Sequence, residues 1–259
     1  MKTYSLEASA SIALIGVPLA NSENPFLSIP IGRTRVDIAV GECSSPRHKI
    51  GVADDNVAYL LSGFIANLEE ITSNKCLQIN INSRNALSRL SAYSLATTLI
   101  VHALAKYHSE TLDTWEILEI ARYADPIEKP SGWTYVIDST RYSTLTGTPV
   151  VFRNDEEFAK IETTFEGDLS YKSTIEATTQ KLTREALGGD VYNSLVRMVG
   201  VMTLEAAVKL REEGNVVAIA ETLGKLQNGL IASIWDIDYP PPNCINVPGL
   251  PGEFDTYCW

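Results

Sequence analysis

Hydrophobic and polar positions in the first half of the chain follow two different periods, which predict strands and helices. Residues 33–40 and 76–82 alternate between apolar and polar side chains, as a strand with one buried face does. Residues 11–17 form a short apolar run that predicts a further strand. Residues 57–68 and 92–107 repeat apolar side chains at the i, i+3, i+4 spacing of an amphipathic helix. Strands and helices are therefore mixed here.

Helix-start signals support this division. Asp54 or Asp55 stands where the N-cap of the first helix is expected, because a short carboxylate side chain accepts hydrogen bonds from unpaired backbone N–H groups. Asp113 and Glu116 have the spacing of a capping box and predict another helix. Residues 148–152 predict a strand near the middle of the chain.

The second half of the chain is predicted to be mostly helical. One helix is expected from Ser173 to about Leu187, and two more over residues 191–210 and 219–230. The tail over residues 240–259 is rich in proline and glycine, so it excludes regular helix and allows at most a late strand. This order of elements predicts an α+β fold.

Composition and charge narrow the class of protein. The 259 residues are 45% hydrophobic, and 32 acidic against 21 basic side chains give a formal charge of -11. Such a charge repels a polyphosphate backbone, so nucleic acid is not an expected partner. The longest apolar region, residues 95–105, is much shorter than the roughly 20 residues that span a bilayer, so no membrane segment is expected. Gly16 and Pro18 interrupt the apolar run near the N-terminus and favour a strand over a signal peptide.

The cysteines and histidines show no metal-binding pattern. Four cysteines at positions 43, 76, 244 and 258 lie far apart without C-x-x-C spacing, which favours reduced structural thiols. The chain has no Asn-x-Ser/Thr sequon. These features predict a cytoplasmic protein without a metal site.

Several phrases of the sequence resemble the GHMP kinase superfamily, whose members phosphorylate small metabolites such as galactose, homoserine and mevalonate. The resemblance rests on residues 10–16, the loop between Asn82 and Tyr93, Pro130-Ser131-Gly132 and the closing helices. It implies a two-lobed fold with a strand-rich N-terminal part over residues 1–150. The helix-rich C-terminal part over residues 151–259 would be a shortened form of its family counterpart.

The family's phosphate loop, Gly-Leu-Gly-Ser-Ser-Ala, corresponds here to residues 86–92, in which the glycines are missing. In the family, backbone N–H groups and a helix N-terminus hold the nucleotide phosphates. The resemblance implies phosphate-binding roles for Asn85, Ser88, Arg89 and Ser91. Alternatively, Arg89 is an ordinary helix-start residue behind a Ser88 cap. The loop over residues 82–91 is expected to join a strand to a helix and to border the main cleft.

A second family signature, Pro-Ser-Gly-x-Asp, has Thr134 at its Asp position. The resemblance implies that Ser131 and Thr134 are the catalytic candidates, although a threonine hydroxyl does not act as a base near neutral pH. A third glycine-rich motif corresponds to residues 248–252, where two prolines remove backbone donors.

Two functions follow from the resemblance. The first is an ATP- and Mg²⁺-dependent small-molecule kinase, or a close relative, with a modified phosphate loop. The second is a non-catalytic homologue without a cofactor that binds a metabolite or a protein partner. A small metabolite is the expected ligand of the kinase and one of the two expected ligands of the non-catalytic homologue, and a homodimer is a further expectation.

Overall fold

The structure is a computed structural model that describes residues 1–20, 22, 24–42, 49–72, 75–82, 86–127, 132–154, 158–177 and 179–259. Strands and helices follow the chain in the order β1 (Lys2–Ile15), β2 (Phe26–Glu42), β3 (Lys49–Gly51), α1 (Asp55–Thr72), β4 (Lys75–Asn82), α2 (Arg89–His108), α3 (Thr114–Tyr123), α4 (Thr134–Thr146), β5 (Val150–Phe152), β6 (Phe158–Lys160), β7 (Ser170–Glu176), α5 (Arg184–Leu187), α6 (Gly189–Glu213), α7 (Val216–Ile219), the π-helical turn η1 (Ala220–Gly224), α8 (Lys225–Trp235), β8 (Cys244–Pro248) and β9 (Glu253–Cys258).

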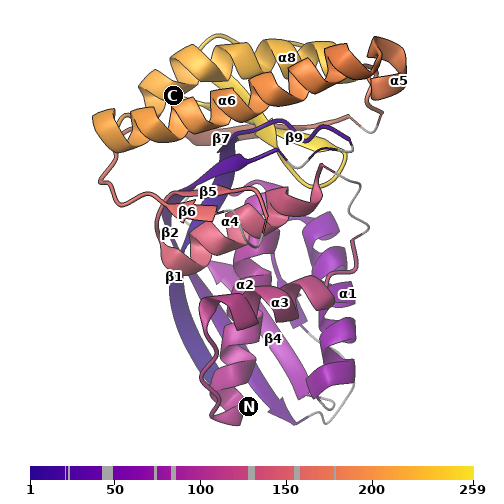
Figure 1. The fold of residues 1–259 in the computed structure, drawn as a ribbon. Coiled ribbons are helices and arrows are strands. Elements are labelled where there is room, and N and C mark those ends of the chain that lie inside the picture. Colours follow the sequence, from indigo (N-terminus) through magenta and orange to yellow (C-terminus); the bar gives the residue numbers. More distant parts are fainter. Residues whose placement is uncertain are drawn as a thin grey trace.

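The first sheet has the strand order β3-β4-β2-β5-β6, and β1 pairs with β2 along nearly its whole length. The β1–β2 pair is antiparallel and continues from Lys2 opposite Val40 to Ile15 opposite Leu27. Helices α2 and α4 pack against β1 and β2, and α1 and α3 pack against α2. In Figure 1 these four helices lie together beside the first sheet.

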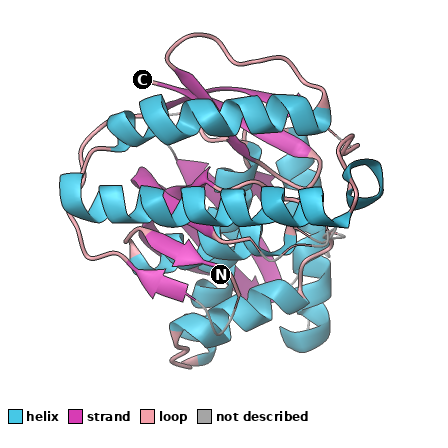
Figure 2. Ribbon diagram, turned by 45° about the horizontal axis from the view of Figure 1, so that its top comes forward, coloured by secondary structure: helices cyan, strands magenta, loops and turns pink. Residues whose placement is uncertain are grey.

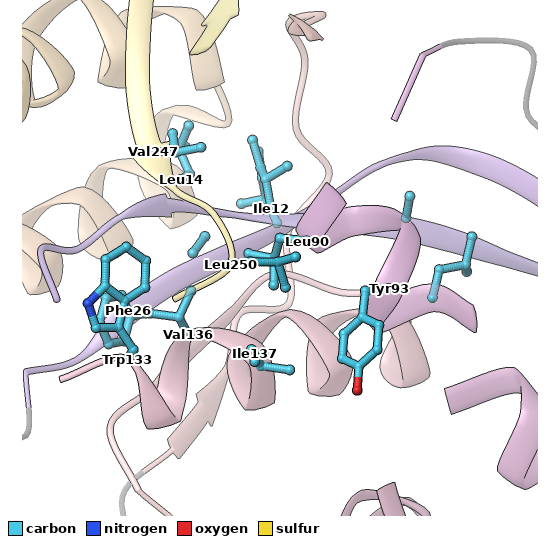
Figure 3. Packing of buried hydrophobic residues seen from close by; sticks show 14 of the residues in the cluster. Ile12, Leu14, Phe26, Leu90, Tyr93, Trp133, Val136, Ile137, Val247 and Leu250 are labelled. Carbon is cyan, nitrogen blue, oxygen red and sulfur yellow. The ribbon is translucent and has the colours of Figure 1, made fainter. Parts of the chain in front are cut away.

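The second sheet is antiparallel and has the order β7-β9-β8. Figures 1 and 2 show the two long helices α6 and α8 lying side by side over it. Strand β8 contacts β1, so the second sheet meets the upper end of the first. Apolar side chains from both parts form one cluster, and Figure 3 shows among them Ile12, Leu14, Leu90, Val136, Ile137 and Val247.

Most elements predicted for the first half are confirmed. The strands at 33–40, 76–82 and 148–152 correspond to β2, β4 and β5, and the two predicted stripes lie in α1 and α2. Asp113 makes the predicted capping box with Glu116 at the start of α3. Residues 11–17 are only the buried end of β1, which begins near the N-terminus.

The helix predicted from Ser173 to Leu187 is wrong. Ser170–Glu176 is strand β7, and only Arg184–Leu187 is helical. Tyr171, Thr174 and Ile175 are partly buried and have the spacing of a helix, but pairing with the distant strand β9 makes this segment a strand. The helices predicted at 191–210 and 219–230 correspond to α6 and to the α7-to-α8 segment.

Helix α4 was not predicted, because it has no apolar stripe. Its buried side chains include Ser139, Thr140 and Ser143. Each of these hydroxyls has a hydrogen-bond partner. Ser139 accepts a hydrogen bond from Ser28 on β2 at 2.8 Å, and Thr140 shares one with Ser94 on α2 at 2.8 Å. Ser143 donates to the Thr148 carbonyl at 2.9 Å. A polar helix is therefore stable in the core because its neighbours supply matching hydroxyls.

The prediction of reduced thiols is wrong. Cys244 and Cys258 form a disulfide between the ends of β8 and β9, with a Cα–Cα distance of 4.0 Å, and Cys76 is also disulfide-bonded. Disulfides are rare in a reducing cytosol outside hyperthermophiles. The cytoplasmic prediction therefore loses one of its supports. None of the described helices has the length and apolar content needed to cross a bilayer.

Gln227 on α8 connects the two sheets. Its side-chain oxygen accepts a hydrogen bond from the Gly16 N–H at 2.8 Å. Its amide nitrogen donates to the Leu14 carbonyl at 3.1 Å and to the Asn246 carbonyl at 2.9 Å. The residue is fully buried, so these backbone groups of β1 and β8 depend on one side chain.

Replacement of Gln227 by leucine should lower the free energy of unfolding by about 3 kcal/mol, because it leaves three buried backbone groups unpaired. Urea denaturation measures this change. The matched control is Leu226→Ala at the neighbouring position, which is 47% exposed and should change stability by less than about 0.5 kcal/mol. Equal stability of both variants would contradict the role assigned to Gln227.

Candidate functional site

The loop predicted to carry the site leads from β4 into the N-terminus of α2. Ser88 is the N-cap in extended conformation, and its hydroxyl accepts a hydrogen bond from the Ser91 N–H. Ala86 and Leu87 border a cavity with a volume of about 920 Å³. The prediction that this loop lies between a strand and the start of a helix is confirmed, and its described residues border a cavity.

The two serines of this loop have partners inside the protein. The Ser91 hydroxyl donates to the Ser11 carbonyl on β1 at 2.8 Å and lies 3.4 Å from the Tyr257 hydroxyl on β9. The Ser88 hydroxyl donates to Ser91 at 3.2 Å. Both serines are buried. Their hydroxyls connect α2 to both sheets.

Arg89 connects the start of α2 to two carboxylates. Its Nε donates to Asp54 Oδ2 at 3.0 Å, and its Nη1 donates to Glu253 Oε1 at 2.6 Å. These carboxylates raise the pKa of Arg89 above its ordinary value. Asp54 also caps α1, because its Oδ1 accepts the Val57 N–H at 3.0 Å. We call Asp54, Arg89 and Glu253 the Arg89 clamp.

The two carboxylates of the Arg89 clamp differ in their exposure to solvent. Side-chain exposure is 39% for Asp54 but only 15% for Glu253. Burial raises the pKa of Glu253, and Arg89 opposes this shift. Glu253 Oε2 is buried and has no hydrogen-bond partner. Arg89 therefore compensates only part of the cost of burying this carboxylate.

Asp255 adds a second buried carboxylate beside the clamp. It accepts a hydrogen bond from the Thr174 hydroxyl on β7 at 2.7 Å. Burial raises the pKa of Asp255 to about 6, although hydrogen bonds from Thr174 and Ser88 act in the opposite direction. Among the described residues, the start of α2 thus faces the carboxylates of Asp54, Glu253 and Asp255 and carries the guanidinium of Arg89, and this balance of charge is unfavourable for a phosphate.

The segment that contains the catalytic candidates approaches the antiparallel hairpin of β8 and β9, which also carries Glu253 and Asp255. Thr134 begins α4, while Ser131 and the side chain of Thr134 lie outside the described residues, as does Asn85. The adjacent Trp133 ring packs on Phe254 of β9 at 5.4 Å. The fold therefore brings the first two motif segments to the strand that directly follows the third: Arg89 contacts Glu253, and Trp133 contacts Phe254.

Gly132 explains why this segment needs a glycine. It has a φ of +92°, and a Cβ atom at this position would lie 2.2 Å from the Leu19 carbonyl oxygen. A larger residue would thus be strained and would collide with the loop after β1. The close approach fixes the segment before α4 against the loop that follows β1.

Two cavities flank the loop at Ala86 and Leu87. The smaller one, about 270 Å³, lies beside α1 and includes Arg89 in its wall. The larger one lies between the sheets. Its described lining is Ser9, residues 29–32, Ala86, Leu87, residues 165–171 and Tyr257, and it contains no lysine or arginine.

Sequence reasoning missed Glu253, Asp255 and Tyr257. These residues alternate along β9, so their side chains share one face of the strand. A period-two pattern was therefore present in the predicted late strand, but it does not reveal that this face points at the start of α2. Among the described residues no three metal-ligating side chains gather.

In comparisons of sequence, neither a family model nor a curated protein matches this chain. Comparison of structures gives full-length matches. Mevalonate kinase from Staphylococcus aureus has a TM-score of 0.60 at 17% identity, with coverage of 100% of this chain and 90% of that one. Mevalonate pyrophosphate decarboxylase from Streptococcus pyogenes has a TM-score of 0.59 at 13% identity, with 99% and 89% coverage.

Galactokinase from Lactococcus lactis matches with a TM-score of 0.57 at 12% identity, and the alignment covers 99% of this chain and 86% of that chain. The chain thus has the two-part α+β fold of the GHMP kinases, which confirms the predicted fold class. Identities this low show the fold alone. The boundary proposed at residue 150 stays a prediction.

The buried Asp255 should give the protein a distinctive pH dependence. Its folded pKa lies above the unfolded value, so the folded state binds more protons between about pH 4 and pH 6 and loses stability as the pH rises through this window. The loss should reach about 2–3 kcal/mol at neutral pH.

Asp255→Asn should remove this loss, so the variant should be more stable than the wild type near neutral pH and equally stable near pH 4. Urea denaturation at both pH values measures the difference. Asp168→Asn is the control, because Asp168 is exposed. Parallel pH profiles for the wild type and Asp255→Asn would show that Asp255 is ionised freely in the folded protein.

Proposed function

We propose that this protein uses a GHMP fold to bind a small metabolite in the cavity of about 920 Å³, without transferring a phosphoryl group from ATP. The observation that carries the proposal is the Arg89 clamp, in which two carboxylates of the chain bind the guanidinium of Arg89 in the first turn of α2. A phosphate would have to displace Glu253 and leave its carboxylate buried and unpaired.

The residues present do not fit the ATP phosphates that the fold family implies. The Ser88 and Ser91 hydroxyls are bound to protein groups, and Glu253 and Asp255 carry negative charge beside them. Loss of two charge-assisted hydrogen bonds alone weakens binding by at least about a hundredfold. We therefore assign neither ATP nor Mg²⁺ as a cofactor.

The larger cavity suits an uncharged or cationic ligand. Among the described residues of its wall, Glu166 and Asp168 carry acidic side chains and none is basic. Tyr171 and Tyr257 add aromatic surface, with their ring centroids 5.7 Å apart. Aromatic faces and carboxylates favour cations and polar neutral groups over anions.

A small-molecule kinase is the second candidate. The full-length likeness to mevalonate kinase and galactokinase structures favours it, although that likeness is one of fold. In this case Thr134 would stand where the family has its aspartate. Catalysis would then rest on positioning and electrostatic stabilisation.

A bulky side chain in the cavity should abolish ligand binding. Ser9 lines the cavity on β1, so Ser9→Trp should fill part of it and raise the dissociation constant at least about tenfold. Ligands come from a thermal-shift panel of neutral, cationic and anionic metabolites, followed by calorimetry. Ser5→Trp, four residues earlier on the same strand and exposed, is the matched control. A ligand that binds all three proteins equally would exclude this cavity as its site.

Addition of ATP and Mg²⁺ should produce neither binding heat nor ATP consumption with any metabolite of the panel. The kinase alternative expects slow turnover that rises on Thr134→Asp, by up to about 10²–10⁴-fold, because a general base returns. Micromolar affinity for ATP, or turnover in either form, would overturn the proposal in favour of the kinase.

A further inference from the structure

Helix α6 has apolar side chains on its outer side as well as on its inner side. The inner side is buried and packs on β1, β2 and β5. Figures 1 and 2 show α6 on the outside of the molecule. Five large apolar side chains of its outer side are between 41% and 64% exposed: Val191, Met198, Val201, Leu204 and Val208. A helix that is apolar on both sides is expected to be covered on both.

The side chains of this outer face are distributed symmetrically about Val201. Successive residues of a regular helix are rotated by about 100°, so Met198 and Leu204 lie about 60° to opposite sides of the line through Val201. Arg197 and Glu205 are exposed and lie about 40° to opposite sides of the same line. Arg197 precedes Val201 by four residues and Glu205 follows it by four. The apolar centre is thus flanked by one cation and one anion at equal separations.

This pattern is complementary to itself in an antiparallel pair of helices. With Val201 on the two-fold axis, each residue before Val201 lies level with the residue equally far after Val201 on the other helix. Met198 then packs against Leu204 of the partner subunit, and Arg197 lies level with Glu205 of the partner subunit. Each contact forms twice by symmetry. A parallel pair would bring Arg197 next to Arg197 of the partner subunit, so the charges select the antiparallel orientation.

Both charged side chains are accessible for this contact. Glu205 contacts Lys209 on its own helix at 3.7 Å, but its side chain stays 52% exposed. Such a surface pair contributes little, so Glu205 can meet a guanidinium from a second chain without a large loss. Arg197 is exposed and, because of its length, reaches across the helix pair to a carboxylate at the same level.

The ends of α6 bring one unfavourable contact into this arrangement. Asp190 lies level with Glu212 of the partner subunit, and the two carboxylates repel each other. Within its own chain, however, Glu212 lies 3.9 Å from Arg211, whose charge offsets this repulsion. These residues are exposed at the helix ends, where crossing helices diverge, so the contact costs little.

The size of the face bounds the strength of the association. A helix of 25 residues is about 37 Å long, and a stripe about 10 Å wide along it covers on the order of 400 Å². Two copies would bury about 800 Å² in total, which is below the standard size of a specific interface. The charge of -11 on each chain opposes association as well. The dissociation constant is therefore expected to be micromolar or weaker.

We propose that two copies of this chain associate reversibly through the outer faces of α6, antiparallel about Val201, with Arg197 of each copy beside Glu205 of the other. A second copy suits this face better than an anionic lipid surface does, because the face contains Glu205 and the chain is acidic. No described residue of α6 lines either cavity. The proposal is thus independent of which ligand the protein binds.

Sedimentation velocity of the full chain, from about 1 to 500 μM, tests this association. The wild type should form a concentration-dependent dimer. Val201→Lys brings two ammonium groups together at the two-fold axis and should weaken the dimer at least about tenfold. Arg197→Glu and Glu205→Arg each create two like-charge pairs and should weaken it about tenfold. The double variant Arg197→Glu/Glu205→Arg restores opposite charges and should return the dissociation constant to near the wild-type value.

Glu119→Arg on α3 is the control, because it changes the net charge as Glu205→Arg does at an exposed position outside α6. It should leave the dimer unchanged. Circular dichroism checks that each variant is folded, and Arg197→Gln replaces Arg197→Glu if the reversal disturbs folding, with a smaller loss of about threefold. Flotation with phosphatidylcholine vesicles tests a lipid surface as the alternative cover.

Four outcomes would each overturn the proposal. They are a wild type that stays monomeric at every concentration, flotation of the monomer with vesicles, single charge variants that dimerise normally, and a double variant that does not recover. Dimerisation of Val201→Lys with wild-type affinity would likewise show that α6 is not the interface.

Discussion

Hydrogen bonding of buried backbone where the two sheets meet is the constraint on which the structure depends. At this junction β1 ends and β8 has an outer edge, and their N–H and C=O groups are remote from water. Gln227 satisfies groups of both strands. The adjacent Asn228 accepts the Asn246 N–H at 2.8 Å and donates to the Cys244 carbonyl. These two amides fix α8 against both sheets and so fix the hairpin of β8 and β9.

The position of that hairpin determines the character of the candidate site. A helix N-terminus is a ready anion site when its N–H groups face open space. In this chain the hairpin places Glu253 and Asp255 in front of α2, and Arg89 bonds to Glu253 and to Asp54. The Phe254 ring of the hairpin also packs against the rings of Trp133 and Trp235, with centroid distances of 5.4 and 4.9 Å and inclined ring planes. Charged side chains of the hairpin thus pack against the start of α2, and its aromatic side chain packs between Trp133 and Trp235.

A buried ion pair holds α4 in place. Arg141 is fully buried and donates through Nη1 and Nη2 to both oxygens of Asp125, and its Nε donates to the Thr97 hydroxyl at 3.1 Å. The Tyr93 hydroxyl also donates to Asp125. The Arg141 guanidinium lies over the Tyr93 ring, with its central carbon 5.5 Å from the ring centroid. Burial of such a pair is costly unless every donor and acceptor is satisfied. The network therefore restricts α4 to one position, and with it the segment that begins at Thr134.

The sequence by itself determined the elements whose signals are local. Helix α1 and strand β4 follow from the spacing of their apolar residues, and the caps at Asp54 and Asp113 follow from contacts two or three residues apart. The resemblance of a few phrases was enough to predict the fold. Strand β7 and the partners of Arg89 were decided only by tertiary structure. Thr174 meets Asp255 81 residues away, and Arg89 meets Asp54 and Glu253 at separations of 35 and 164 residues. Local periodicity carries no information about such pairings, because they arise only when distant segments pack together.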